Sequence, residues 1–194
     1  MPFVEAIILS LVVAYFRKGN IRQLGELDLR NTWMIFVPAG LMALLFTKNI
    51  HGLEFMGKLA LVAHTAAYAT VLLVIVMNRR LPGMIIIGIG AALNFTVMAA
   101  NGGKMPVSYD AVKRVHMEKM FSSNMARHCI LNKGTRLGFL GDVIPRPWPP
   151  FPERDIPSVG DIFVSVGLFI LVQHGTCYRK RRDVDAPANA ENSA

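Results

Sequence analysis

The sequence lacks most of the features from which a reaction or a disulfide-bonded fold is usually inferred. It has two cysteines, Cys129 and Cys177, which are too few for a disulfide framework. The motifs H-E-x-x-H, G-x-S-x-G and C-x-x-C and a phosphate-binding loop are all absent. No internal repeat of the kind that many transporters show is visible. Motifs therefore assign no chemistry to this chain.

Charged residues are also scarce, and the high share of apolar residues indicates a membrane protein. Charged residues make up 18% of the sequence and hydrophobic residues 53%, and the mean hydropathy is +0.39. The net charge is nevertheless +8. In a membrane protein such an excess reflects Lys and Arg that flank the spans, and here the basic residues form no nucleic-acid-binding module. We expect the lipid bilayer to be a partner and nucleic acid not to be one.

Five apolar segments predict an all-α fold, namely a polytopic helical membrane bundle of about five transmembrane helices. The predicted spans are residues 2–16, 32–47, 59–77, 81–100 and 159–177. The first segment could instead be a signal peptide, but its basic residues follow it and no A-x-A cleavage pattern appears. We interpret it as a retained helix and residues 1–177 as one membrane-embedded domain.

The distribution of basic residues predicts the orientation of the bundle. Four lie in the linker 17–31, two in the turn 78–80 and four in residues 179–182. With five spans these segments share one side, which the positive-inside rule assigns to the cytoplasm. The segment 101–157 carries nine more, but long loops count little in this rule. We predict a multi-pass protein of the cell (cytoplasmic) membrane with its N-terminus outside and its C-terminus in the cytoplasm.

The segment 101–157 is the one long stretch without an apolar run, and we expect it to cover the outer end of the bundle. Residues 108–133 predict one or two amphipathic helices, whereas residues 134–157 are too rich in proline for a long helix. The linker 17–31 is either a short helix on the membrane surface or a solvated loop. The tail 178–194 is basic and then polar, and should be disordered.

A few polar or small residues inside the predicted spans are candidates for a functional or a packing role. His64 and Tyr68 are four residues apart and share a helix face; a hydrogen bond near the helix end is favoured over a functional role. Gly88 and Ala92 form a small-xxx-small pair that lets a neighbouring helix approach, either from this chain or from another subunit. Asn94 lies near the outer end of the same span, where packing is again the favoured role.

The outer segment and its return to the membrane hold the other candidates. Ser158 and Asp161 match the S-x-x-D capping pattern ahead of the last span, so a structural cap is the favoured interpretation. His116, His128 and Cys129 suggest a metal site, but their spacing matches no ligand pattern. We expect no metal and no cofactor.

Four features in order carry a family resemblance: NGGKMPVS at 101–108, RHCILNKGTRLGFLGDVIP at 127–145, SVGDIF at 158–163, and a span ending in LVQ at Gln173. The chain resembles a bacterial family of multi-pass membrane proteins defined as a domain of unknown function. The resemblance implies a helical integral membrane protein and transfers no catalytic residue. The matched positions are Asn101, Gly102, Gly103, Met105, Pro106, His128, Thr135, Asp142, Pro145, Gly160 and Asp161.

The sequence leaves three functions open. The favoured one is a non-catalytic accessory, scaffold or lipid-facing protein, which binds other membrane protein subunits or forms a homo-oligomer. The second is a membrane-embedded hydrolase or lipid-modifying enzyme with Asp142, Asp161 and His128 gathered under the outer segment. The third is a small transporter. In each case we expect the motifs NGG-MP, GDVIP and SVGD to converge on one outer rim.

Overall fold

The computed structural model describes residues 2–36, 40, 54–115, 128–146 and 155–177. These residues are mainly helical, in agreement with the all-α class. Their long α-helices are α1 (Pro2–Phe16), α3 (Glu54–Met77), α4 (Met84–Ala100) and α7 (Val159–Cys177). The helices coincide with four of the five predicted apolar segments. Of the segment 32–47, a 3-10 helix, η2 (Thr32–Ile35), is described; most of that predicted span, and the tail 178–194, lie outside the described residues.

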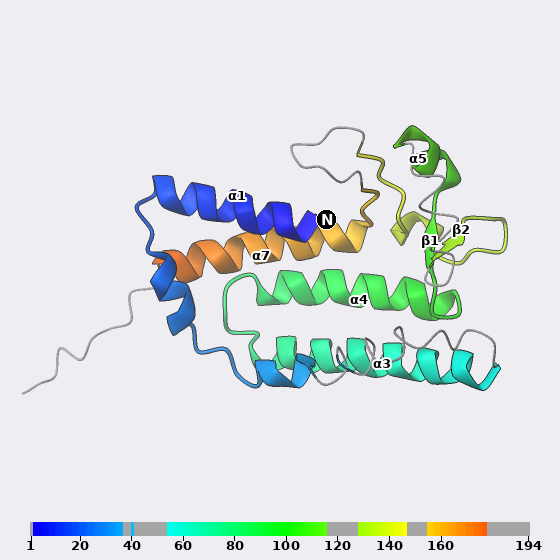
Figure 1. Cartoon of the computed structure of the whole chain (residues 1–194), viewed down its shortest axis with the longest axis horizontal. Helices are drawn as coiled ribbons and strands as arrows, with labels where there is room; N and C mark the ends of the chain where they lie inside the picture. The colour runs from blue at the N-terminus through cyan, green and yellow to red at the C-terminus, as the bar shows by residue number, and fades with distance from the viewer. Residues whose placement is uncertain (1, 37–39, 41–53, 116–127, 147–154, 178–194) are drawn as a thin grey trace, which may run out of the picture.

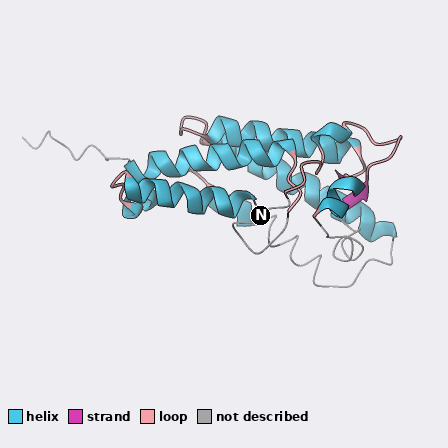
Figure 2. Ribbon diagram, turned by 90° about the horizontal axis from the view of Figure 1, so that it is seen from above, coloured by secondary structure: helices cyan, strands magenta, loops and turns pink. Residues whose placement is uncertain are grey.

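The long helices lie side by side in the order α1, α7, α4, α3 (Figure 1). Neighbouring contacts show that α7 is antiparallel to α4 and parallel to α1. The two short strands lie at one end of the elongated bundle (Figure 2). We call this the cover end. The opposite end, formed by residues 17–31 and 78–83 with the last turn of α7, is called the basic end.

Glycine allows α4 and α7 to touch along their backbones. A Cβ on Gly83 would lie 2.2 Å from the carbonyl oxygen of Gly167, and a Cβ on Gly90 would lie 2.4 Å from that of Gly160. The two glycine pairs are seven residues, or about two helical turns, apart along each helix. Gly88 faces α3 instead, because its Cβ would lie 2.9 Å from Ile75 Cγ2. The predicted packing partner of Gly88 is therefore a helix of the same chain.

The linker between α1 and η2 folds onto the end of α7. It contains a 3-10 helix, η1 (Ile21–Glu26), in which the Arg22 amide donates a hydrogen bond to the Asn20 side chain. The Leu24 and Leu27 side chains reach within 2.7 Å of where a Cβ on Gly175 would lie. The apolar side of the linker is thus packed on α7, an arrangement that neither interpretation of the sequence included.

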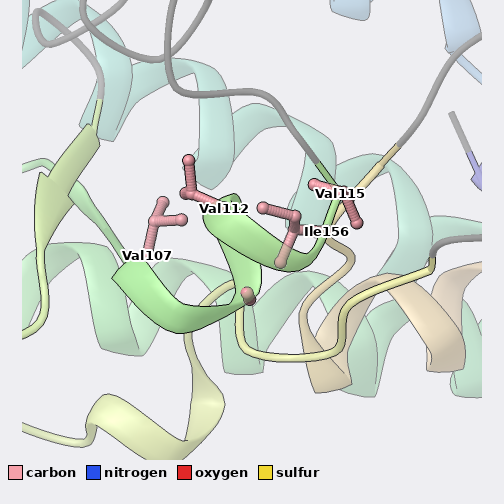
Figure 3. Close-up of a cluster of buried hydrophobic side chains, with 5 residues drawn as sticks. Val107, Val112, Val115 and Ile156 are labelled. Carbon is pink, nitrogen blue, oxygen red and sulfur yellow. The ribbon is translucent and has the colours of Figure 1, made fainter.

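The cover is a small unit built from both halves of the outer segment. It contains β1 (Met105–Val107), α5 (Tyr109–Arg114), β2 (His128–Ile130) and the 3-10 helix η3 (Gly138–Leu140). Apolar side chains of β1 and α5 pack with Ile156, which precedes α7 (Figure 3). The members of this cluster are Val107, Ala111, Val112, Val115 and Ile156.

One helical prediction in the cover is wrong. Residues 108–133 were expected to form amphipathic helices, but His128–Ile130 are a strand that pairs in parallel with β1. Only Tyr109–Arg114 are helical among the described residues of that range, and residues 116–127, including His116, lie outside the description. Pairing with a distant strand supplies hydrogen bonds that outweigh a weak local helical preference.

Candidate functional site

Asn94 joins the outer ends of α4 and α7. Its Nδ2 donates a hydrogen bond of 2.8 Å to Asp161 Oδ1, and its Oδ1 accepts one of 2.9 Å from Ser158 Oγ. A Cβ on Gly160 would lie 2.1 Å from Asn94 Oδ1, so a residue with a side chain at position 160 would displace this amide. The absence of a side chain at Gly160 therefore leaves room for the hydrogen bonds that Asn94 makes between the two helices.

Ser158 and Asp161 form the reciprocal cap that their spacing predicts. The Asp161 amide donates to Ser158 Oγ at 3.0 Å, and the Ser158 amide donates to Asp161 Oδ2 at 3.1 Å. Because Asn94 bonds the other oxygen of Asp161, both carboxylate oxygens have partners. The favoured structural role of Asp161 is thus supported by its geometry.

Asp142 is the point at which the three outer motifs meet. Its backbone amide donates to Pro106 O at 2.8 Å, and its carbonyl accepts from the Ser108 amide at 3.0 Å. Asp142 also forms isolated β-bridges with Val107 on one side and Ser158 on the other. The sequence prediction that NGG-MP, GDVIP and SVGD converge on one rim therefore describes the structure correctly.

The side chain of Asp142 is buried in an unusual electrostatic setting. Its Oδ2 lies 3.6 Å from His128 Nε2, and only 14% of the side chain is exposed. Burial, followed by the negative charges of Asp161 and Asp155, raises the pKa of Asp142 from 3.8 to about 8. A carboxyl group with this pKa is mainly protonated at neutral pH.

Several candidates lie away from this meeting point. Thr135 belongs to a turn in which its Oγ1 accepts a hydrogen bond from the Asn132 amide. Gly102 has a φ of +67° and lies in open space, whereas Met105 is buried in β1. Pro145 lies in the extended segment between Ile144 and Arg146, where backbone hydrogen bonds connect it to residues 155–157.

The predicted hydrogen bond between His64 and Tyr68 involves a side chain, that of His64, which the structure does not describe. The Tyr68 ring packs against that of Phe95 on α4, with their centroids 5.7 Å apart. Within the described residues, no three His, Cys, Asp or Glu side chains are arranged to hold a metal ion. Cys129 is in the cover and Cys177 ends α7, at the opposite end of the bundle.

Two asparagines at helix ends bind the backbone of distant arginines in the same way. Asn101, which caps α4, accepts from the Arg136 amide at 3.0 Å and donates to the Arg136 carbonyl at 2.7 Å. Asn78, directly after α3, makes the equivalent pair with Arg30 at 2.7 and 2.9 Å. Asn101 was a candidate but Asn78 was missed. The sequence feature that could have indicated Asn78 is a carboxamide side chain at the point where a predicted span ends and a basic turn begins.

The second missed contact is an ion pair between the cover and α1. The guanidinium of Arg146 binds both carboxylate oxygens of Glu5, with Nη2 to Oε1 at 2.7 Å. Pairing across 141 positions of sequence cannot be inferred from the local pattern.

Comparison with known proteins gives a family without an assigned activity. Residues 26–173 match the model described as "Family of unknown function (DUF5317)". A protein of Thermotoga maritima, described as an uncharacterized protein, is 28% identical over 168 residues, which cover 87% of this chain and 86% of that protein. No solved structure matches. Because the family model covers most of the chain, including all three rim motifs, the chain belongs to the DUF5317 family of unknown function.

Proposed function

We propose that this chain is a multi-pass protein of the cytoplasmic membrane, with its N-terminus outside, that acts without catalysis as an accessory or scaffold protein for other membrane proteins. The observation that carries the proposal is the distribution of polar and apolar side chains in the helices. Ser10 and Thr176 are fully buried, and Gln173 is nearly so. By contrast, Leu9, Val62 and Ile85 are 58%, 63% and 61% exposed.

Two of the buried polar side chains, Ser10 and Gln173, connect α1 with α7. Ser10 Oγ donates to the Phe169 carbonyl at 3.0 Å, and Gln173 Nε2 donates to Ser10 Oγ at 3.0 Å. Arg17 Nη1 then donates to Gln173 Oε1 at 2.8 Å. Polar contacts inside and aliphatic side chains outside are typical of helices in lipid, whereas in water so much exposed apolar surface favours aggregation.

Helix length gives partial support to this placement. Among the described residues, α7 is the one helix long and apolar enough to cross a membrane, and α1, α4 and residues 65–77 are apolar but shorter. The 19 residues of α7 extend about 28 Å, close to the ~30 Å hydrocarbon core. A shorter helix is accommodated by local thinning of the bilayer and by charged residues at its ends.

The non-catalytic role follows from how the rim residues are used. Asn94, Ser158 and Asp161 bond one another, and Asn101 bonds the Arg136 backbone. These side chains hold the cover on the helices and do not converge on a reacting position. A cover fixed to the helices by these hydrogen bonds, on a bundle with an apolar surface, is suited to binding a neighbouring membrane protein.

A membrane-embedded enzyme is the second candidate, because one pair of side chains favours it. Asp142 has a raised pKa and lies beside His128, and a perturbed carboxyl next to an imidazole is characteristic of acid–base sites. Hydrolysis of an ester or phospholipid by the purified protein, abolished in Asp142→Asn and retained in Asp110→Asn, would favour this candidate over the first.

Fractionation and co-purification test the first proposal. We expect the full-length protein to stay in the membrane pellet after alkaline carbonate extraction, and to bring down a reproducible protein partner from native membranes in mild detergent. Release of the protein by carbonate would contradict the membrane placement. A protein that is integral but repeatedly purifies with neither a protein partner nor a second copy of itself would contradict the accessory role alone.

A further inference from the structure

Asn78 holds two basic segments together at the basic end. Its side chain is almost completely buried, with 3% of the residue exposed. The carboxamide pairs with both backbone groups of Arg30, and its Nδ2 also donates to the Val74 carbonyl in the last turn of α3 at 2.7 Å. The linker is therefore fixed against the turn that joins α3 and α4.

This attachment gathers three arginines. Arg79 and Arg80 follow Asn78 directly, and Arg30 is bound to it, so the three residues lie around one side chain. All three are exposed. In the part of the chain that the structure describes, none of the three guanidinium groups takes part in a hydrogen bond or ion pair, not even with Glu26 or Asp28 of the same linker. Their charges are available to an external anion.

An apolar surface lies next to the arginines. Val76 and Met77, in the last turn of α3, are 57% and 39% exposed. The 3-10 helix η2 packs against α3 and presents Trp33, which is 64% exposed, and Phe36 follows it with 76% exposed. Guanidinium groups next to exposed aromatic and aliphatic side chains match a ligand that has a charged head and an apolar chain.

We propose that this surface, made of Arg30, Arg79 and Arg80 with Trp33 and Val76, binds the headgroup and upper acyl chain of an anionic phospholipid. The inference rests on the proposed membrane location, because the lipid would lie in the leaflet at the basic end. The planar guanidinium fork pairs with two phosphate oxygens at once. The adjacent apolar side chains favour a lipid over a free phosphate, which has no chain to contact them.

Charge neutralisation at the two ends of the bundle tests the site. The purified full-length protein is titrated with phosphatidylglycerol, phosphatidylethanolamine or inorganic phosphate, and bound lipid is counted by native mass spectrometry. We expect Arg30→Gln, Arg79→Gln and Arg80→Gln together to weaken phosphatidylglycerol binding about tenfold or more. The matched control neutralises Lys104, Lys133 and Arg136 at the cover end, where Asn101 holds Arg136 as Asn78 holds Arg30.

The remaining arms separate this inference from its alternatives. Replacing the same three arginines by Lys keeps the charge and removes the fork, and should leave intermediate binding. The inference would be overturned if both neutralised triple variants lost the same amount of phosphatidylglycerol binding. It would also be overturned if the wild type bound phosphatidylethanolamine as well as phosphatidylglycerol, or if inorganic phosphate displaced the bound lipid. The thermal midpoint without lipid checks that each variant folds. Carbonate extraction of the membranes from which each variant is purified scores membrane integration, so failure of the lipid site and failure of the proposed function are distinguishable.

Discussion

At the scale of single residues, Asp142 combines a structural and a titratable role. Its backbone connects Pro106 and Ser108 of the cover, and it bridges to Ser158 at the entry to α7. Its carboxyl group lies among negative charges in a buried place, which raises its pKa to about 8. The protonated form is therefore the one that the folded state favours.

The stability of the protein should depend on pH through Asp142. Because the folded-state pKa is above the ordinary value of 3.8, the stabilisation is complete below about pH 4 and is lost as the pH rises through about 8. The unfolding free energy should fall by at most about 1.4 kcal/mol per pH unit within that window. Asp142→Asn should remove this slope, as measured by thermal denaturation in detergent across the window.

The control for this prediction is Asp110→Asn, which makes the same change at an exposed position in the first turn of α5. This variant should keep the wild-type slope. The titratable groups near Asp142 include His128, Asp155 and Asp161. An Asp142→Asn protein whose stability falls with pH as steeply as the wild type would show that one of these other groups is responsible.

At the scale of elements, the contact between α4 and α7 sets the position of the rim. Gly83 and Gly90 lie against Gly167 and Gly160. The close approach brings Asn94 within hydrogen-bond distance of Asp161 and Ser158. Small residues are therefore part of the site, although none of them contributes a functional group.

Gly90→Ala should separate these two helices. The added methyl group would lie 2.4 Å from the Gly160 carbonyl, a contact that a backbone atom cannot relieve without movement of the helix. Overpacking of this kind costs about 1–3 kcal/mol, which should appear as a lower thermal midpoint. Gly25→Ala is the matched control, because nothing lies within 4 Å of its Cβ. Equal midpoints for the two variants would contradict the close packing.

At the scale of the whole molecule, the two ends of the bundle differ in what they expose. Two hydrogen bonds hold the linker 17–31 at the basic end, one from the Asn20 amide to the Thr176 carbonyl and one from the Arg30 amide to the Asn78 side chain. The linker and the turn 78–80, both predicted to be cytoplasmic, therefore lie together. The cover occupies the other end, together with the start of α1, where Glu5 binds Arg146. This arrangement puts the linker 17–31 and the turn 78–80 at the same end of the bundle; the proposal that this end is cytoplasmic rests on the positive-inside rule.

Single cysteines can test the orientation in intact cells. Cys129 and Cys177 are first changed to Ser, so that the introduced cysteine is the one thiol that can be labelled. In that background, Lys133→Cys in the cover should react with a membrane-impermeant maleimide, and Arg22→Cys at the basic end should react only after permeabilisation. Both positions are exposed. The reverse labelling pattern would contradict an outside N-terminus.

The sequence alone located four of the helices and the motifs of the rim, because these depend on local patterns. Apolar runs define α1, α3, α4 and α7, and the S-x-x-D spacing specifies the cap at Ser158. The convergence of the rim motifs followed from topology, since one segment leaves and re-enters the bundle at the same end. The strand His128–Ile130 was missed because its partner lies 23 positions away, at Met105.

What the sequence by itself determined is therefore the solvent preference of each segment: which residues are apolar, where basic residues flank them and where the backbone turns. Only the tertiary structure decided which polar groups meet, because those contacts depend on how the helices are placed in space. It showed Asn78 holding Arg30 and Arg146 bound to Glu5. It also placed Asp142 where burial and neighbouring carboxylates raise its pKa.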